Sequence, residues 1–182
     1  LFPYTTLFRS VALLEEYGRK KQIYVVTQFN HPREITGEAK EAVRLLMRAG
    51  VVVRNQTVLL RGVNDSPEVL GALLRGLTAI GVTPYYIFQC RPVTGVHSQF
   101  QVPLHEAYRI VEGAKQLQNG QGKCVRYVLS HVTGKIEILG EMGEGKMLFK
   151  YHQAKYPQDV GRIFTQDILK DQCWLESKIP PQ

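Results

Sequence analysis

Cysteine is scarce in this chain, and long apolar runs are absent. The three cysteines, Cys90, Cys124 and Cys173, are widely spaced and form no CxxC pair, so the sequence indicates neither a disulfide framework nor a zinc site. No apolar run approaches the ~18 residues that a membrane span requires. With 44% hydrophobic and 21% charged residues, the composition is typical of a soluble globular protein. We therefore expect a cytoplasmic protein with reduced thiols and no membrane partner.

A dense basic patch is also missing. The formal net charge is +7, but lysine and arginine are scattered, and the densest cluster is the short run at 19–21. A diffuse positive charge suits a protein that binds anionic cofactors or substrates rather than nucleic acid. The alternative is a basic RNA-binding α/β module in which Tyr85, Tyr86 and Phe88 stack on bases. Their position inside a strand pattern favours core packing instead.

The opening segment, "LFPYTTLFRS" at residues 1–10, fits neither a domain start nor a targeting segment. It shows no helical or strand periodicity and no basic-then-apolar gradient. The string resembles the translated end of a common sequencing adapter, fused to the reading frame that follows. We therefore expect residues 1–10 to be an artefact and the natural chain to begin near Val11, in the middle of a protein.

From residue 11 to about residue 120, apolar periodicity predicts helices that alternate with buried strands. Thr36 and Ser66 are predicted N-cap residues, and Gly50 and Gly81 occupy the C-terminal stop position of a helix. Alternation at intervals of about 30 residues is typical of βαβ units in a parallel sheet. The predicted strands are 23–27, 51–60 and 83–90, and the predicted helices are 11–20, 37–49, 67–80 and 104–117.

From residue 121 the pattern changes to short strands at 124–130, 135–139 and 147–151, separated by a tight turn and a Gly-rich hairpin. This pattern is typical of an antiparallel tail. The predicted fold class is therefore α/β. Residues 11–120 form the C-terminal half of a partial (β/α) barrel, and residues 121–182 form a hairpin and a C-terminal extension. The stretch from Gln166 is expected to be irregular.

Three polar segments follow the predicted parallel strands, namely "TQFNHPRE", "NQTVLLRGVND" and "YYIFQCRPVTG". Because ligands bind at the carboxyl ends of parallel strands, these segments are candidate binding loops. The "VTGK" turn lacks the GxxxxGK[ST] spacing of a phosphate-binding loop. The residues alone indicate a fragment of an α/β barrel-like enzyme and do not name its reaction.

Four ordered motifs, "TQFNHPREIT", "NQTVLLRGVND", "PYYIFQC" and "TGKIEILG", resemble the lysine 2,3-aminomutase family of radical S-adenosylmethionine enzymes. The resemblance covers about Ile23–Gly140, and the segment from Phe149 onward resembles a less characterised branch of that family. It implies a partial (β/α) barrel of the radical S-adenosylmethionine type. It also implies an isomerase that moves an amino group between adjacent carbons of an amino acid. The implied cofactors are pyridoxal 5′-phosphate, S-adenosylmethionine and a [4Fe-4S] cluster, and we expect a homo-oligomer.

The CxxxCxxC loop that binds the cluster in this family does not occur in the chain. The resemblance therefore implies that the cluster cysteines lie upstream, that no metal ligands are present here, and that this chain alone is inactive. An alternative with the same fold is a radical S-adenosylmethionine enzyme that modifies a peptide or protein side chain without pyridoxal phosphate.

Lys135 falls where the family has the lysine that forms a Schiff base with pyridoxal phosphate. The resemblance makes it the candidate catalytic residue and a cofactor-binding residue. Such a lysine must be uncharged to attack an aldehyde. Gly134, directly before it, would let the backbone approach the cofactor closely. Without the resemblance, Lys135 would be interpreted as an exposed hairpin lysine.

Further candidate cofactor contacts lie at the strand ends: Gln28, Asn30, His31, Asn55 and Gln56. By the resemblance, the strand that carries Asn55 and Gln56 contacts S-adenosylmethionine, and an amide offers both a donor and an acceptor. Gln28 stands where the family has His. For each group a structural alternative stays open. Asn55 and Gln56 could instead satisfy neighbouring backbone groups at the end of the sheet. His31 could be a structural residue of the loop.

Arg91 and Tyr86 are the candidate substrate contacts. In lysine-specific family members two aspartates hold the substrate ammonium, but Arg91 stands at the first of these places, and no Asp occurs between Ser66 and Gln158. A guanidinium about 4 Å from a lysine ammonium would cost a few kcal/mol. An anionic amino acid such as glutamate fits better, because a carboxylate matches the guanidinium fork. The alternative is that Arg91 points to solvent at the barrel rim.

Overall fold

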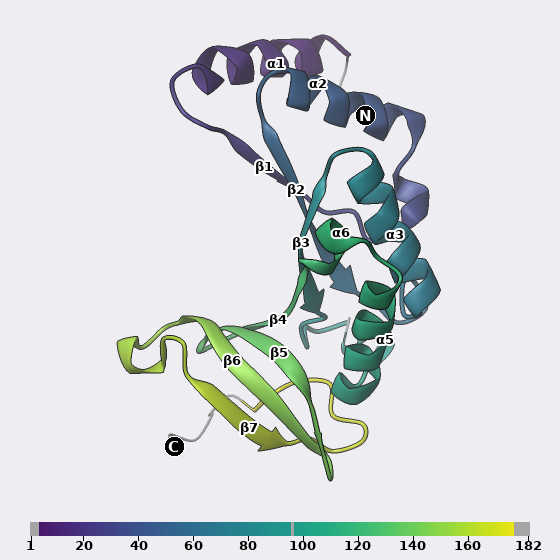
Figure 1. The fold of residues 1–182 in the computed structure, drawn as a ribbon, viewed down its shortest axis with the longest axis vertical. Coiled ribbons are helices and arrows are strands. Elements are labelled where there is room, and N and C mark those ends of the chain that lie inside the picture. The colour runs from purple at the N-terminus through teal and green to yellow at the C-terminus, as the bar shows by residue number, and fades with distance from the viewer. Residues whose placement is uncertain (1–3, 96, 177–182) are drawn as a thin grey trace.

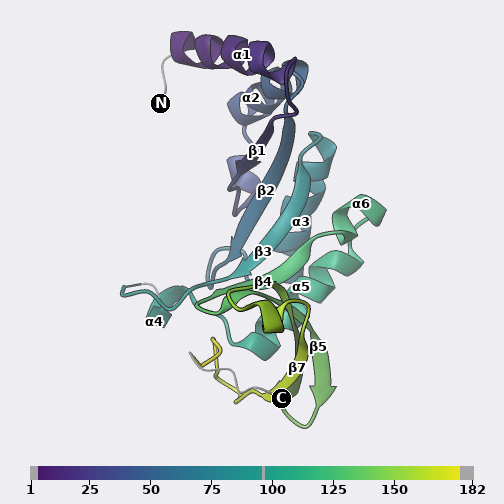
Figure 2. The ribbon, with the colours of Figure 1, turned by 90° about the vertical axis from the view of Figure 1, so that its left-hand side faces the viewer.

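The computed structural model describes residues 4–95 and 97–176, and within these ranges the strands form one seven-stranded sheet (Figures 1 and 2). The strand order follows the chain from β1 to β7, so the sheet is open. β1 to β4 pair in parallel, and β4 to β7 pair antiparallel. The predicted α/β architecture with an antiparallel tail is confirmed. The strands are β1 (Tyr24–Thr27), β2 (Val52–Leu59), β3 (Thr83–Gln89), β4 (Arg126–His131), β5 (Gly134–Gly143), β6 (Lys146–Ala154) and β7 (Ile163–Asp167).

Helices connect the parallel strands, and α3, α5 and α6 lie on the same side of the sheet in both views (Figures 1 and 2). Among the described residues, no helix combines the length and apolar character that crossing a membrane requires. The helices are α1 (Tyr4–Gly18), α2 (Gly37–Arg48), α3 (Pro67–Ala79), α4 (His97–Phe100), α5 (Leu104–Gln116) and α6 (Gly120–Lys123), with 3-10 turns η1 (Pro32–Glu34) and η2 (Pro157–Asp159).

Side-chain caps fix the starts of α2 and α3. The Thr36 hydroxyl accepts a hydrogen bond from the Ala39 N–H at 3.2 Å, and the Ser66 hydroxyl accepts one from the Val69 N–H at 3.2 Å. These bonds satisfy backbone N–H groups that have no partner inside the first helical turn. After α2, Gly50 has a φ of 77°, a left-handed conformation that glycine adopts without strain. Both predicted N-caps are confirmed.

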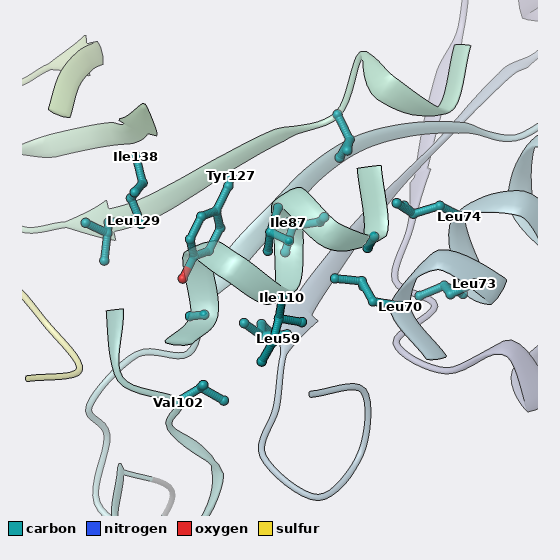
Figure 3. Packing of buried hydrophobic residues seen from close by; sticks show 14 of the residues in the cluster. Leu59, Leu70, Leu73, Leu74, Ile87, Val102, Ile110, Tyr127, Leu129 and Ile138 are labelled. Atoms are coloured by element: carbon teal, nitrogen blue, oxygen red, sulfur yellow. The ribbon is translucent and has the colours of Figure 1, made fainter. Parts of the chain in front are cut away.

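The hydrophobic core lies between the sheet and the helices α3 and α5 (Figure 3). Four leucines of α3, spaced three, one and three residues apart, are fully buried, and each stabilises the fold by about 1.5–3 kcal/mol. β2 alternates between buried and partly exposed residues, so one of its faces packs on the helices and the other faces the uncovered side. The α3 leucines are Leu70, Leu73, Leu74 and Leu77.

Two elements differ from the sequence-based expectation. α1 begins at Tyr4, inside the segment 1–10 for which no regular structure was predicted, and residues 11–18 are its second half, whereas the sequence predicted the end of a helix at 11–20. β7 was not predicted, although it pairs with β6 along Ile163–Asp167. Phe164 of β7 stacks on Phe149 of β6 with ring centroids 5.4 Å apart. Burial of these two rings accounts for the additional strand.

Residues 168–176, which we call the C-terminal strap, return from β7 toward the ends of β3 and β4. The Leu104 N–H donates to the Gln172 carbonyl at 2.9 Å. The Gln89 amide at the end of β3 donates to the Cys173 carbonyl at 2.9 Å. The strap is therefore held by main-chain carbonyls that accept bonds from the first residue of α5 and from the end of β3.

Glu141 links β5 to α5 and provides a pH-dependent contribution to stability. Its carboxylate lies 2.8 Å from His105 Nδ1 and 3.2 Å from Arg109 Nη2. Partial burial raises the pKa of the Glu141 carboxyl, but the hydrogen bonds from His105 and Arg109 outweigh burial, so this pKa lies below its ordinary value. A lowered carboxyl pKa in the folded state stabilises the protein above the unfolded-state pKa, and this stabilisation is lost as the pH falls through the folded-state pKa.

We expect Glu141→Gln to lower the free energy of unfolding by about 1 kcal/mol at pH 7. The difference from the wild type should shrink as the pH falls below the unfolded-state carboxyl pKa of about 4.3, and it should vanish below the folded-state pKa, where the carboxyl is protonated in both states. Chemical denaturation at several pH values measures this difference. Glu112→Gln is the matched control, because Glu112 pairs with Lys115 within the same helix and should change stability by about 0.5 kcal/mol or less. A pH-independent effect of Glu141→Gln would contradict the prediction.

Candidate functional site

A cavity of about 450 Å³ lies at the carboxyl ends of the four parallel strands. Its walls come from the segments after β1 and β3, from β2 and from the end of β4. This is the edge where ligands bind in parallel α/β sheets. The lining residues are Gln28, Asn30, Gln56, Val58, Leu60, Phe88, Gln89, Cys90, Arg91, Val93 and Ser130.

The register of β2 and β3 directs side chains into this cavity. Gln56 pairs with Tyr86, and Val58 pairs with Phe88, so these four side chains share one face of the sheet. A bulge at Tyr85 shifts the register between Asn55 and Gln56. Without this additional residue, the side chains of β3 that follow it would point to the opposite face of the sheet. The bulge therefore sets which aromatic rings line the uncovered face.

Asparagines shape the wall formed by the loops after β1 and β2. The Asn30 side-chain oxygen accepts a bond from the Val58 N–H at 2.8 Å. Asn64 is fully buried; it accepts a bond from the Leu60 N–H and donates to the carbonyls of Asn30 and Val58. The sequence analysis did not single out Asn64. The sequence did contain a signal for this role of Asn64: an asparagine a few residues after a predicted buried strand commonly forms hydrogen bonds with the backbone of a turn.

Asn55 does not line the cavity, so its predicted contact with a cofactor is not supported. It is 1% exposed, and its side-chain oxygen accepts a bond from the Phe29 N–H at 2.7 Å while its nitrogen donates to the Phe29 carbonyl at 3.0 Å. Its amide also contacts the hydroxyls of Thr27 and Thr57. Asn55 thus joins β1 to β2, which is the structural alternative left open above.

His31 also has a structural position. Its Nδ1 accepts a hydrogen bond from the Arg33 N–H at 3.1 Å and caps the 3-10 turn η1. Together with Pro32 and residues of α3, it lines a separate hollow on the surface. The predicted contact of His31 with the cofactor is therefore not supported by the lining of the main cavity, and the loop alternative describes its position.

Lys135 lies beside the cavity, on the second residue of β5. It pairs with Ser130, a lining residue of β4, so both side chains share the cavity face. Its Nζ is 4.3 Å from the centroid of the Tyr86 ring and 5.5 Å from that of Phe88, which also lines the cavity. Within the described ranges, no carboxylate forms an ion pair with Lys135. The amine is held by aromatic faces instead.

The pairing of β5 with β6 requires a glycine at position 134. Gly134 has a φ of 145°, and an added Cβ would lie 2.1 Å from the Gln153 carbonyl oxygen and 2.9 Å from the Ala154 Cα. That side of Gly134 is therefore occupied by β6. The close backbone approach that the structure shows at Gly134 is to β6, and an approach to a cofactor stays a prediction.

Tyr86 is 1% exposed and does not line the cavity, so its predicted contact with the substrate is not supported. Burial raises the pKa of its phenol well above the usual range. Its hydroxyl lies 2.8 Å from Nε2 of His152, and Nδ1 of His152 lies 2.8 Å from Arg126 Nη1. The sequence analysis missed His152 and Arg126, because their contact depends on the register of three strands.

The described lining of the cavity carries one positive charge. Among the described residues that line it, Arg91 is the one charged side chain. Arg91 is also exposed, as expected for a residue at the rim. Burial, and to a smaller extent the nearby Cys173, raises the pKa of the Cys90 thiol, so Cys90 contributes no negative charge at neutral pH. An anionic group that enters the cavity therefore meets a single positive charge and several amides.

The residues present do not fit an iron-sulfur cluster. Within the described part of the chain, no three His, Cys, Asp or Glu side chains gather in the geometry of a metal site. Cys90 is buried and Cys124 is exposed, on different elements. A lysine amine beside this cavity does fit the aldehyde cofactor that the resemblance implies, because the amine is the group that condenses with an aldehyde.

Comparison with known proteins identifies the family. A protein of Aquifex aeolicus (strain VF5), provisionally named L-lysine 2,3-aminomutase, is 46% identical over 156 residues, which are 86% of this chain and 41% of that protein. The L-lysine 2,3-aminomutase of Fusobacterium nucleatum is 45% identical over 98 residues, which are 54% of this chain and 23% of that enzyme. The chain belongs to the lysine 2,3-aminomutase family. It spans 41% of the length of the Aquifex relative.

Other members of the lysine 2,3-aminomutase family differ in their named substrate. The glutamate 2,3-aminomutase of Clostridioides difficile (strain 630) is 42% identical over 98 residues, which are 54% of this chain and 21% of that enzyme. No family model matches the sequence. A solved radical S-adenosylmethionine methyltransferase from Sphaerobacter thermophilus overlaps with a TM-score of 0.44 at 20% identity, covering 65% of this chain and 38% of that one. The fold description rests on the strand order and not on this overlap.

In this member of the lysine 2,3-aminomutase family, the cavity brings together four of the predicted residues: Gln28, Asn30, Gln56 and Arg91. Lys135 lies beside them. Asn55, His31 and Tyr86 have structural contacts instead. Four of the predicted side chains therefore line the cavity at the strand ends and these three do not, and the roles of all of them stay predictions.

Proposed function

We propose that this chain is part of a radical S-adenosylmethionine aminomutase that uses pyridoxal phosphate to move an amino group between adjacent carbons of an amino acid. The observation that carries the proposal is the position of the Lys135 amine beside the cavity at the carboxyl ends of four parallel strands. Membership of the lysine 2,3-aminomutase family supports the same reaction class, an isomerisation.

Different residues of this chain would bind the two organic cofactors. The Lys135 amine is the nucleophile that would hold pyridoxal phosphate, and Phe88, 5.5 Å from it, forms an apolar wall. When bound, this cofactor supplies an aldehyde and a conjugated ring that stabilises charge. The amides of Gln28 and Gln56, which line the same cavity, are the donors and acceptors available to S-adenosylmethionine. The cluster requires ligands outside the described residues, so no step is derived for it.

Borohydride reduction tests the proposal. The full-length protein that carries this segment is incubated with pyridoxal phosphate, reduced with borohydride, digested and examined by mass spectrometry. We expect a stable adduct on the peptide that contains Lys135. An adduct on other lysines in equal amount, or none at all, would contradict the proposal. A protein that cleaves S-adenosylmethionine but yields no adduct would instead be a radical enzyme acting on a peptide or protein side chain.

We further propose that the substrate is an anionic amino acid whose carboxylate binds Arg91. This guanidinium is the one charged group on the described cavity wall, and it would repel the side-chain ammonium of lysine. A relative in the same family is named for glutamate. A cytoplasmic location, a homo-oligomeric state and the absence of nucleic-acid and membrane partners remain part of the proposal. Size-exclusion chromatography of the full-length protein tests the oligomeric state.

Substitution of Arg91 tests this substrate class. We expect Arg91→Gln to raise the KM for an acidic amino acid by about 10- to 100-fold, the range of one charge-assisted hydrogen bond. Arg91→Lys should recover part of this loss, because an ammonium retains the charge without the planar fork. Steady-state kinetics with glutamate and lysine measure the effect. Arg48→Gln, at the exposed end of α2, is the control. Turnover of lysine but not of acidic amino acids would refute the substrate assignment.

A further inference from the structure

Three side chains form a hydrogen-bonded series next to Lys135. Arg126 of β4 contacts Nδ1 of His152 of β6 at 2.8 Å, and Nε2 of the same imidazole contacts the Tyr86 hydroxyl of β3 at 2.8 Å. Three strands that are distant in the chain thus contribute one residue each. The series ends at the ring whose face meets the Lys135 amine, 4.3 Å from the ring centroid.

The direction of these hydrogen bonds follows from the chemistry of the guanidinium. An arginine has only N–H donors, so Nδ1 of His152 accepts the bond from Arg126. A neutral imidazole with an accepting Nδ1 carries its proton on Nε2. Nε2–H therefore donates to the Tyr86 hydroxyl. Burial and the charge of Arg126 lower the pKa of His152, against an opposing contribution from Glu137, which agrees with a neutral ring.

The Tyr86 ring is held on several sides. It is 1% exposed, its centroid lies 5.5 Å from that of Phe88, and the His152 ring meets its edge at 5.8 Å with an interplanar angle of 69°. The hydrogen bond from His152 fixes the remaining freedom at the hydroxyl end. A fixed ring presents its electron-rich face to the ammonium of Lys135 in one orientation.

We propose that Tyr86, His152 and Arg126 are positioning residues that hold the Lys135 amine beside the cavity. Arg126 sets the tautomer of His152, His152 fixes the Tyr86 ring, and the ring face holds the amine. That the held amine then binds pyridoxal phosphate rests on the proposed function. The array itself is defined by the contacts of this chain and does not require the cofactor.

Competitive acetylation of the full-length protein tests the array without the cofactor. Trace acetic anhydride labels the lysines, and mass spectrometry gives the labelling of Lys135 relative to Lys146, which is exposed at the start of β6. His152→Phe removes both hydrogen bonds of the imidazole. We expect it to raise the relative labelling of Lys135 about two- to fivefold, the range that loss of one cation–π contact accounts for. His152→Gln retains one acceptor and one donor and should restore the wild-type ratio.

A double-mutant cycle shows whether His152 acts through Tyr86. Tyr86→Phe keeps the ring but removes the hydroxyl, so it should raise the labelling of Lys135 as His152→Phe does. Adding His152→Phe to Tyr86→Phe should then cause no further change. Additive effects, or unchanged labelling in either single variant, would overturn the proposal. Circular dichroism and thermal unfolding establish that each variant is folded. If His152→Phe does not fold, Tyr86→Phe and His152→Gln decide the question.

The borohydride experiment separates this proposal from the proposed function. An expected labelling pattern together with no pyridoxal phosphate adduct would retain the positioning array and reject the cofactor assignment. An adduct on Lys135 in the wild type, with labelling that is insensitive to His152, would retain the proposed function and reject the array.

Discussion

Replacing Lys135 by alanine is expected to abolish capture of pyridoxal phosphate by the full-length protein and to lower amino-group migration by at least about 10³-fold. The physical reason is that the Lys135 amine lies beside the cavity, 5.5 Å from the ring centroid of the lining residue Phe88. No other lysine is among the described residues that line the cavity, so we expect no second amine to take its place. The adduct after borohydride reduction and the initial rate with an acidic amino acid measure the two effects.

The matched control is Lys146→Ala, which removes a lysine from the other end of the β5 and β6 hairpin. We expect it to leave both the adduct and the rate within about twofold of the wild type. Lys135→Arg is a second useful variant, because its guanidinium keeps a cation near the Tyr86 ring but does not condense with an aldehyde. Full activity of Lys135→Ala would show that the nucleophile lies elsewhere in the protein.

Gly134→Ala is expected to lower the free energy of unfolding by at least about 3 kcal/mol, or to separate β5 from β6 near their ends. The added Cβ would lie 2.1 Å from a backbone carbonyl oxygen of Gln153. Backbone atoms cannot rotate away as the end of a side chain can, so one of the two strands must move. The positive φ of Gly134 adds strain for any residue that has a Cβ. Because Lys135 follows directly, cofactor capture should fall together with stability.

Gly140→Ala is the control for this prediction. It lies in the same strand, and its Cβ would meet the Tyr108 hydroxyl at 3.4 Å, an ordinary contact with a mobile side chain. We expect a change of about 1 kcal/mol or less. Thermal and chemical denaturation measure both variants. Equal stability of Gly134→Ala and Gly140→Ala would mean that the close approach of β6 is relieved at little cost.

The helices and parallel strands could be predicted because their signals are local. The caps at Thr36 and Ser66 and the left-handed residue Gly50 act within one helical turn, and the structure confirms the two caps and the turn. β7 could not be predicted in the same way. Phe164 becomes part of a strand because it stacks on Phe149, which is distant in the chain. A contact of that kind depends on the paired strand and not on the local sequence.

For the candidate site, the sequence predicted residues at the edge of the sheet where the cavity lies, but it did not show which of these side chains line the cavity. Asn55 and Gln56 are adjacent, so they face opposite sides of β2. Apolar residues occur on both sides of this strand, so the pattern does not show which face the helices cover. The contact between Tyr86 and His152 depends on the bulge in β3 and on the register of two antiparallel pairs. Neither the bulge nor the strand register can be derived from the spacing of residues in the sequence.

The C-terminal strap makes the two halves of the sheet energetically dependent on each other. Besides its bonds at Gln172 and Cys173, the strap accepts a contact at the Glu176 carbonyl from Nε2 of His131, at 3.0 Å. If the strap detached, the buried Gln89 amide would lose one acceptor, and the fully buried Tyr127 hydroxyl, bonded to that same amide, would lose a rigid partner. Local unfolding of the strap would therefore destabilise the carboxyl end of β3, whose residues form part of the cavity wall.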